Sequence, residues 1–156
     1  MLKRITSASE LRSVLDQMDG TELLKKVCGT LKHVAGEWDI NHLKSRLVEM
    51  LLSIKENAVI FVYFRDEKPN SIFAGYVSLD WACNKKILSE VIWVTVGKTN
   101  FDGVKVLQAA ENFILENSID AMNCSYMCHG GDPRLQLFLT NNGFQLDTLS
   151  FVKNYK

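Results

Sequence analysis

The sequence predicts a single α/β domain, also describable as α+β, with helices packed on a mostly antiparallel sheet. Three observations lead to this fold class. Helical spacing of apolar residues dominates the first third of the chain, β-branched and aromatic runs follow over 58–96, and helix and strand signals then alternate. No repeat and no Pro- or Ser-rich linker divides the chain, so we expect one domain over 1–156.

Composition excludes several classes of protein. Apolar residues make up 47% and charged residues 23% of the chain, which is typical of a compact domain with its own core. The formal net charge is zero, so neither nucleic acid nor an anionic membrane is predicted as a partner. No apolar run approaches the ~20 residues that span a bilayer. The four cysteines lack the spacing of a secreted disulfide framework, which predicts reduced thiols and a cytoplasmic protein.

A short strand at 2–6 precedes two or three predicted helices. Ser7 and Glu10 have the spacing of a capping box, and apolar residues at helical spacing follow them. The same spacing recurs over 21–34, and Asp39 can cap a third helix. The apolar stripe of this third helix should pack on a sheet and consists of Leu43, Leu47, Met50, Leu51 and Ile54.

The apolar period changes at residue 58. A continuous apolar run over 58–64 is typical of a strand buried on both faces, and 72–79 and 87–96 predict two more strands. A polar turn at 65–71 separates the first two, so we expect an antiparallel three-stranded meander. A loop at 97–103 follows the meander.

The C-terminal third alternates helix and strand. The helix after the loop has an apolar face of Val106, Leu107, Ala110, Phe113 and Ile114. Residues 121–127 predict a fifth strand. Asp132 followed by Pro133 opens another helix, Gly143 ends it, and 144–152 form the last strand.

This order of elements resembles the GNAT superfamily of N-acetyltransferases nearly end to end. Residues 132–144, in which a helix ends in Gly143-Phe144 before a final strand, look like the family's C-terminal segment. The resemblance implies a central mixed, mostly antiparallel sheet of six to seven strands flanked by helices. It also implies acetyl-CoA-dependent transfer of an acetyl group to an amine acceptor, on a protein or a small molecule.

The family binds the pyrophosphate of coenzyme A with a loop of the pattern Gln/Arg-x-x-Gly-x-Gly/Ala. Backbone amides and a helix N-terminus meet the phosphates there. The matching segment begins at Lys98 and ends at Gly103, so the resemblance assigns Lys98, Gly103 and Val104 to the cofactor. Phe101 replaces the first glycine, and Asp102 adds a negative charge where another anion would bind.

The resemblance also suggests catalytic residues. Backbone groups of Val94 and Val96 would meet the pantetheine arm. Glu90 lies where several members place a carboxylate that activates water, although it can equally be a solvent-facing strand residue. The usual acid, a tyrosine, is replaced by Leu139, and Tyr126 could stand in for it or simply be a core residue.

These departures keep other functions open. The changes at Phe101 and Leu139 support a catalytically inactive GNAT-like domain that acts as a structural or protein-binding module. Eroded GNAT-like domains of this kind occur among phage proteins, including virion components, so the resemblance also suggests a phage origin. An acyltransferase for a longer acyl-CoA, with Phe101 and Trp93 lining the pocket, is a third hypothesis.

The sequence does not predict a metal site. Cys124, Cys128 and His129 lack a second pair of ligands at zinc-site spacing, so we expect no metal and interpret the thiols as small packed hydrophobes.

The resemblance also suggests a homodimer, in which the last strand, 144–152, is exchanged or paired between the two copies.

Overall fold

The computed structural model describes residues 1–23, 39–54, 57–96, 101–124 and 133–146. In chain order its elements are β1 (Leu2–Arg4), α1 (Ala8–Gln17), α3 (Ile40–Ile54), β2 (Ala58–Arg65), β3 (Lys68–Leu79), β4 (Lys86–Thr95), α4 (Phe101–Glu116), β5 (Ala121–Asn123) and α5 (Pro133–Asn141). Residues 20–23 are also helical, and the rest of the helix predicted over 21–34 lies outside the described residues.

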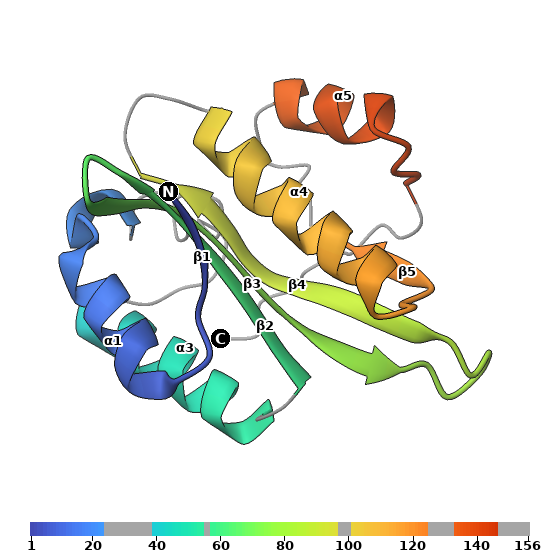
Figure 1. Ribbon diagram of the computed structural model, residues 1–156, viewed down its shortest axis with the longest axis horizontal. Helices are drawn as coiled ribbons and strands as arrows, with labels where there is room; N and C mark the ends of the chain where they lie inside the picture. Colours follow the sequence, from blue (N-terminus) through green and yellow to red (C-terminus); the bar gives the residue numbers. More distant parts are fainter. Residues whose placement is uncertain (24–38, 55–56, 97–100, 125–132, 147–156) are drawn as a thin grey trace, which may run out of the picture.

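The strands form one mixed sheet in the order β1-β2-β3-β4-β5 (Figure 1). Neighbouring strands are antiparallel, except that β4 and β5 are parallel. The predicted meander and the mostly antiparallel sheet are therefore confirmed. The described sheet has five strands where six to seven were expected. Of the last predicted strand, 144–146 are not in a strand, and 147–152 lie outside the described residues.

Helices cover both faces of this sheet. In Figure 1, α1 and α3 lie on one face, and α4 and α5 lie on the other. Alternate residues of β2 supply both sides of the core, because successive side chains of a strand point in opposite directions. Ile60 and Val62 pack with α1 and α3, whereas Val59 and Phe61 pack with α4. The prediction that this strand is buried on both faces is confirmed.

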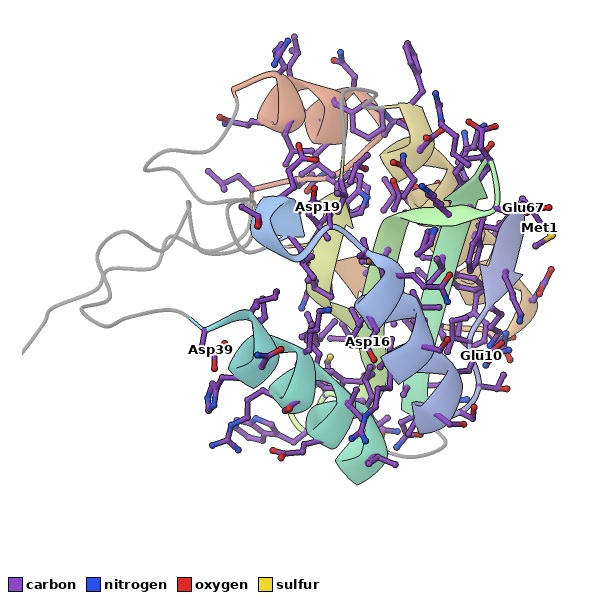
Figure 2. All side chains as sticks on the ribbon, turned by 90° about the vertical axis from the view of Figure 1, so that its left-hand side faces the viewer. Met1, Glu10, Asp16, Asp19, Asp39 and Glu67 are labelled. Atoms are coloured by element: carbon purple, nitrogen blue, oxygen red, sulfur yellow. The ribbon has the colours of Figure 1, made fainter. Side chains whose placement is uncertain are left out.

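The helix caps predicted at Ser7 and Asp39 are present, and the one predicted at Asp132 lies outside the described residues. The Ser7 hydroxyl accepts a hydrogen bond from the Glu10 amide at 3.2 Å, and the Glu10 carboxylate accepts one from the Thr6 amide at 3.3 Å. The Asp39 carboxylate accepts from the Asn41 amide at 2.9 Å, and Figure 2 shows Asp39 at the start of α3. Such bonds satisfy amides that a helix leaves free in its first turn.

The polar turn predicted at 65–71 is shorter in the structure. Asp66 and Glu67 have φ of 48° and 64°, so these two residues form the turn and β3 already begins at Lys68. Two successive residues with positive φ give the twist that a two-residue hairpin needs. Pro69 is tolerated in β3 because the β2–β3 register shifts beside it.

The predicted loop before α4 also ends early. Helix α4 begins at Phe101, so Gly103 belongs to its first turn, and 97–100 lie outside the described residues. Pro133 opens α5, and Gly143 has the positive φ of 85° expected at its end. No helix among the described residues is long and apolar enough to cross a membrane.

Candidate functional site

Strands β4 and β5 stay paired over only a short distance. Their parallel ladder joins Ile87 to Ala121, Leu88 to Met122 and Ser89 to Asn123. Among the described residues, which reach Cys124 on the β5 side, no pair follows Ser89–Asn123. From Glu90 onward, the edge of β4 that faces away from β3 is therefore not occupied by β5 in the part of the chain the structure describes.

A β-bulge lies where this ladder ends. Gly75 of β3 pairs with Glu90 and Ala74 pairs with Ile92, which leaves Val91 without an opposite residue. Val91 and Ile92 both pack against the core on the α1 and α3 side. The bulge interrupts the alternation of side chains, so Glu90 shares a sheet face with the residues that pack on α4.

Gly75 makes this bulge sterically feasible. A Cβ atom at residue 75 would lie 2.5 Å from the carbonyl oxygen of Ser89, so any larger residue would push the bulged backbone away. A glycine inside a strand pattern is a known indication of a bulge or of a close backbone approach. Gly75 is therefore a signal for the bulge in the sequence, and the strand predicted over 72–79 did not include the bulge.

Cys124 lies close to two carboxylates near the end of the ladder. Its side chain is half-buried and packs against the α4 side of the core. Burial raises the pKa of this thiol to about 12, and the nearby charges of Glu90 and Glu111 contribute to the increase. Cys124 is therefore a neutral thiol, in line with its interpretation as a packed hydrophobe and unsuited to act as a nucleophile.

The described residues contain no group of three or more His, Cys, Asp or Glu side chains that could hold a metal ion. Cys128 and His129, which the sequence placed near Cys124, lie outside the described residues.

The first turn of α4 packs tightly on β4. A Cβ atom at Gly103 would lie 2.7 Å from the Thr95 hydroxyl oxygen and 3.4 Å from the Trp93 indole nitrogen. That indole nitrogen donates a hydrogen bond to the Gly103 carbonyl at 3.0 Å. The Thr95 hydroxyl is also hydrogen-bonded to the Ser71 hydroxyl, at 2.7 Å. Gly103 therefore allows the helix N-terminus to approach the strand closely.

Phe101 and Asp102 point in opposite directions. Phe101 is 80% exposed, whereas the Asp102 side chain is fully buried. The Asp102 carboxylate accepts hydrogen bonds from Arg65 at 2.8 and 2.9 Å and from the Asn70 amide at 2.6 Å. These partners belong to β2 and β3, on the side of β4 away from β5. The negative charge that Asp102 adds to this segment is therefore compensated by Arg65.

Backbone groups along β4 differ from the predicted assignment. The Val96 amide donates to the Asn70 carbonyl at 2.8 Å, so it is already engaged with the β3 side. Residues of an antiparallel strand alternate between bonding one neighbour and pointing away from it. Val94 therefore also directs its backbone groups toward β3, while Trp93 and Thr95 direct theirs toward the β5 side. This corrects the assignment of Val94 and Val96.

The remaining predicted residues have varied positions. Val104 is half-buried in the first turn of α4, and Leu139 is buried in α5. Lys98 and Tyr126 lie outside the described residues, so their roles stay predictions. The structure thus packs Gly103 on β4, the strand that also carries Glu90.

No protein-family model matches the sequence, and no curated protein matches it. Solved structures do resemble it. An aminoglycoside acetyltransferase from an uncultured soil metagenomic sample is 16% identical, with a TM-score of 0.68 over 100% of this chain and 96% of that chain. The chain has the GNAT fold. The predicted superfamily fold is thereby confirmed.

The GNAT fold is shared by proteins with different descriptions. A second aminoglycoside acetyltransferase from an uncultured soil sample is 8% identical, with a TM-score of 0.65 over 100% of this chain and 98% of that chain. A transcriptional regulator from Bacillus halodurans C-125 is 11% identical, with a TM-score of 0.72 over 99% of both chains. A function for this chain therefore has to be argued from its own residues.

Proposed function

We propose that the chain is an acetyl-CoA-dependent N-acetyltransferase acting on an amine acceptor. The observation that carries this proposal is the end of the β4–β5 ladder at Ser89 and Asn123, directly before the bulge at Val91. In the part of the GNAT fold that the structure describes, β5 does not pair with β4 beyond this point, and this stretch of β4 carries the half-buried Glu90 and packs on the first turn of α4. The cofactor supplies the acetyl thioester when it is bound.

The residues of α4 and β4 fit such a cofactor. The amides of Gly103 and Val104, together with Lys98, would hold the pyrophosphate at the N-terminal end of a 16-residue helix. The negative charge of Asp102 is compensated by Arg65, and the exposed Phe101 does not pack into the core. Backbone groups of Trp93 and Thr95 would bind the extended arm along β4.

Glu90 is the residue we assign to proton transfer. The acceptor amine has to lose a proton before it attacks the thioester carbon, and a carboxylate acting through water can accept that proton. Holding the amine and the thioester side by side supplies much of the rate. The neighbouring Cys124 stays protonated over the working pH range and does not compete with the amine as a nucleophile.

A second function is favoured by one observation on α5. Leu139, at the position of the family's usual tyrosine acid, is only 7% exposed and has no proton to donate. If Phe101 also obstructs the loop, the domain would be an inactive GNAT-like module that binds a protein partner. The two functions differ in whether coenzyme A binds.

Calorimetric titration of acetyl-CoA into the purified protein tests the first function. We expect saturable binding that Lys98→Glu weakens about tenfold or more, because a charge reversal beside a phosphate is repulsive. Lys85→Glu makes the same change of charge at the exposed β3–β4 turn and should leave the affinity unchanged. Gly103→Arg is unsuitable as a control, because its Cβ would displace α4 from Thr95. No binding at millimolar ligand would reject the enzyme and favour the protein-binding module.

Glu90→Gln tests the catalytic assignment. We expect kcat to fall about 10²-fold, the lower end of what general-base catalysis contributes, while the affinity for acetyl-CoA stays within about twofold. Glu111→Gln removes the other carboxylate near Cys124 and should retain kcat. An unchanged kcat in Glu90→Gln, measured with an amine that the wild type acetylates, would remove Glu90 from the mechanism.

A further inference from the structure

A partly buried ion pair connects the first turn of α4 to the β2–β3 hairpin. Asp102, Arg65 and Asn70 make up this group, which we call the Asp102 clamp. The Arg65 guanidinium binds both carboxylate oxygens of Asp102 through Nε and Nη2, and the Asn70 amide donates to one of them. Bidentate pairing of this kind fixes orientation as well as distance.

The carboxylate of the clamp is surrounded by positive charge. Arg65 keeps 45% of its side chain exposed, and the hydrogen bond that it donates to Asp102 raises the pKa of its guanidinium. The Lys105 ammonium lies 3.8 Å from the carboxylate and donates to the Tyr63 hydroxyl at 2.7 Å. The negative charge of Asp102 is therefore compensated from the β2 side of the helix.

The Asp102 clamp lies directly beside the candidate cofactor site. Asp102 immediately precedes Gly103, whose contact with Thr95 leaves no room for a side chain. The first turn is thus held from one side by Arg65 and Asn70, and from the other by the bond between Trp93 and Gly103. Its amides can shift only if one of these contacts breaks.

We propose that Asp102 and Arg65 are positioning residues for the cofactor site: their ion pair holds the first turn of α4 on the sheet, and Arg65 compensates the negative charge of Asp102. This inference rests on the proposed function, because the ligand it concerns is coenzyme A. The β2–β3 hairpin then supports the site without having to touch the ligand.

The balance of charge in the clamp predicts how each variant changes the affinity for coenzyme A. Arg65→Gln leaves a buried carboxylate without its main partner, next to amides that should attract phosphate. We expect this variant to bind coenzyme A about tenfold more weakly, because the uncompensated carboxylate repels phosphate. Asp102→Asn removes the charge itself and should weaken binding about threefold, through lost orientation alone.

The double variant Arg65→Gln/Asp102→Asn decides between two explanations. A neutral pair has no buried charge to compensate, so we expect its affinity to return to within about threefold of the wild type. If the two side chains merely support the fold, the double variant should bind as weakly as Arg65→Gln or more weakly. Arg46→Gln changes the net charge equally on the exposed face of α3, where Arg46 pairs with Glu49, and serves as the control.

The experiment combines calorimetry of coenzyme A with amide hydrogen exchange of the ligand-free protein. In the absence of ligand, exchange at 101–104 should increase in Arg65→Gln and in the double variant, because both lack the bidentate pair that holds the first turn. Exchange that stays at the wild-type rate in both variants, or a double variant that does not regain affinity, would overturn the proposal. A wild type that fails to bind coenzyme A would reject the proposed function and, with it, the role of the clamp at a cofactor site, while the exchange data still decide whether the clamp holds the helix.

Discussion

Cys124 is the residue whose ionisation the structure changes most clearly. Burial raises its pKa from the ordinary 9.0 to about 12, with smaller contributions from Glu90 and Glu111. Between these two values the folded protein keeps the thiol proton and the unfolded chain releases it. The stabilisation linked to Cys124 is therefore complete below about pH 9 and is lost as the pH rises toward about 12.

Urea unfolding of the wild type and of Cys124→Ala at about pH 8 and about pH 10.5 measures this loss. We expect the wild type to lose more free energy of unfolding between the two pH values than Cys124→Ala does. The exposed Cys83 provides the matched control, and Cys83→Ala should follow the wild type. Parallel losses in the wild type and Cys124→Ala would show that the thiol is not responsible.

The hydrogen-bond partners of Asp102 could not be predicted from the sequence. Its charge was visible in the phosphate-loop segment, but its partners Arg65 and Asn70 lie 37 and 32 residues away in the chain. Both belong to a segment whose pattern predicted a solvated turn. Only the pairing of β2 with β3, and the packing of α4 across them, brings the three together. Glu90 is conspicuous in the sequence as a lone carboxylate in an apolar strand, and its role stays a prediction.

At the scale of the element, α4 and α5 end in the same way. In α4 the Ile119 amide donates to the Ile114 carbonyl at 3.1 Å, and in α5 the equivalent bond reaches Leu139 at 3.0 Å. Each pattern places the preceding residue at positive φ, which is Ser118 with 51° in α4 and Gly143 with 85° in α5. Glycine adopts this conformation without the steric cost that a Cβ atom brings.

Exchanging residue types at these two helix ends should have opposite effects on stability. We expect Ser118→Gly to raise the free energy of unfolding by about 1 kcal/mol and Gly143→Ala to lower it by about the same amount. A Cβ atom at residue 143 would meet nothing within 4 Å, so the second effect comes from the backbone alone. Urea denaturation measures both. A less stable Ser118→Gly would mean that the serine side chain itself holds the end of α4.

Element types were predictable where the local pattern decides them. Caps at Ser7 and Asp39, the meander and the glycine after α5 follow from short-range chemistry and were predicted. The two-residue turn at Asp66-Glu67 was predicted too long, since non-glycine residues rarely take positive φ. The bulge opposite Gly75 was missed, because bulges depend on the register of the neighbouring strand.

At the scale of the whole molecule, one sheet separates two apolar clusters and contributes side chains to both. The order of helix and strand signals was enough to predict the fold class, because short connections leave few ways to arrange such elements. The end of the β4–β5 ladder could not be predicted in the same way. It depends on how far two strands separated by α4 remain parallel, and no local residue pattern encodes that distance.

The shared sheet predicts how the protein unfolds. Leu15 of α1 and Leu107 of α4 are both fully buried, in clusters on opposite faces of β2, β3 and β4. Because the same strands line both clusters, loss of either should unfold the other. We expect Leu15→Ala and Leu107→Ala each to cost about 2–5 kcal/mol and to lower Tm by about 5–15 °C within one transition. Calorimetric scans should show a single peak for each variant, with coincident loss of far-ultraviolet circular dichroism and tryptophan fluorescence. Two peaks, of which each variant shifts only one, would instead mean that the two helical layers unfold independently and that 1–156 is not one cooperative domain.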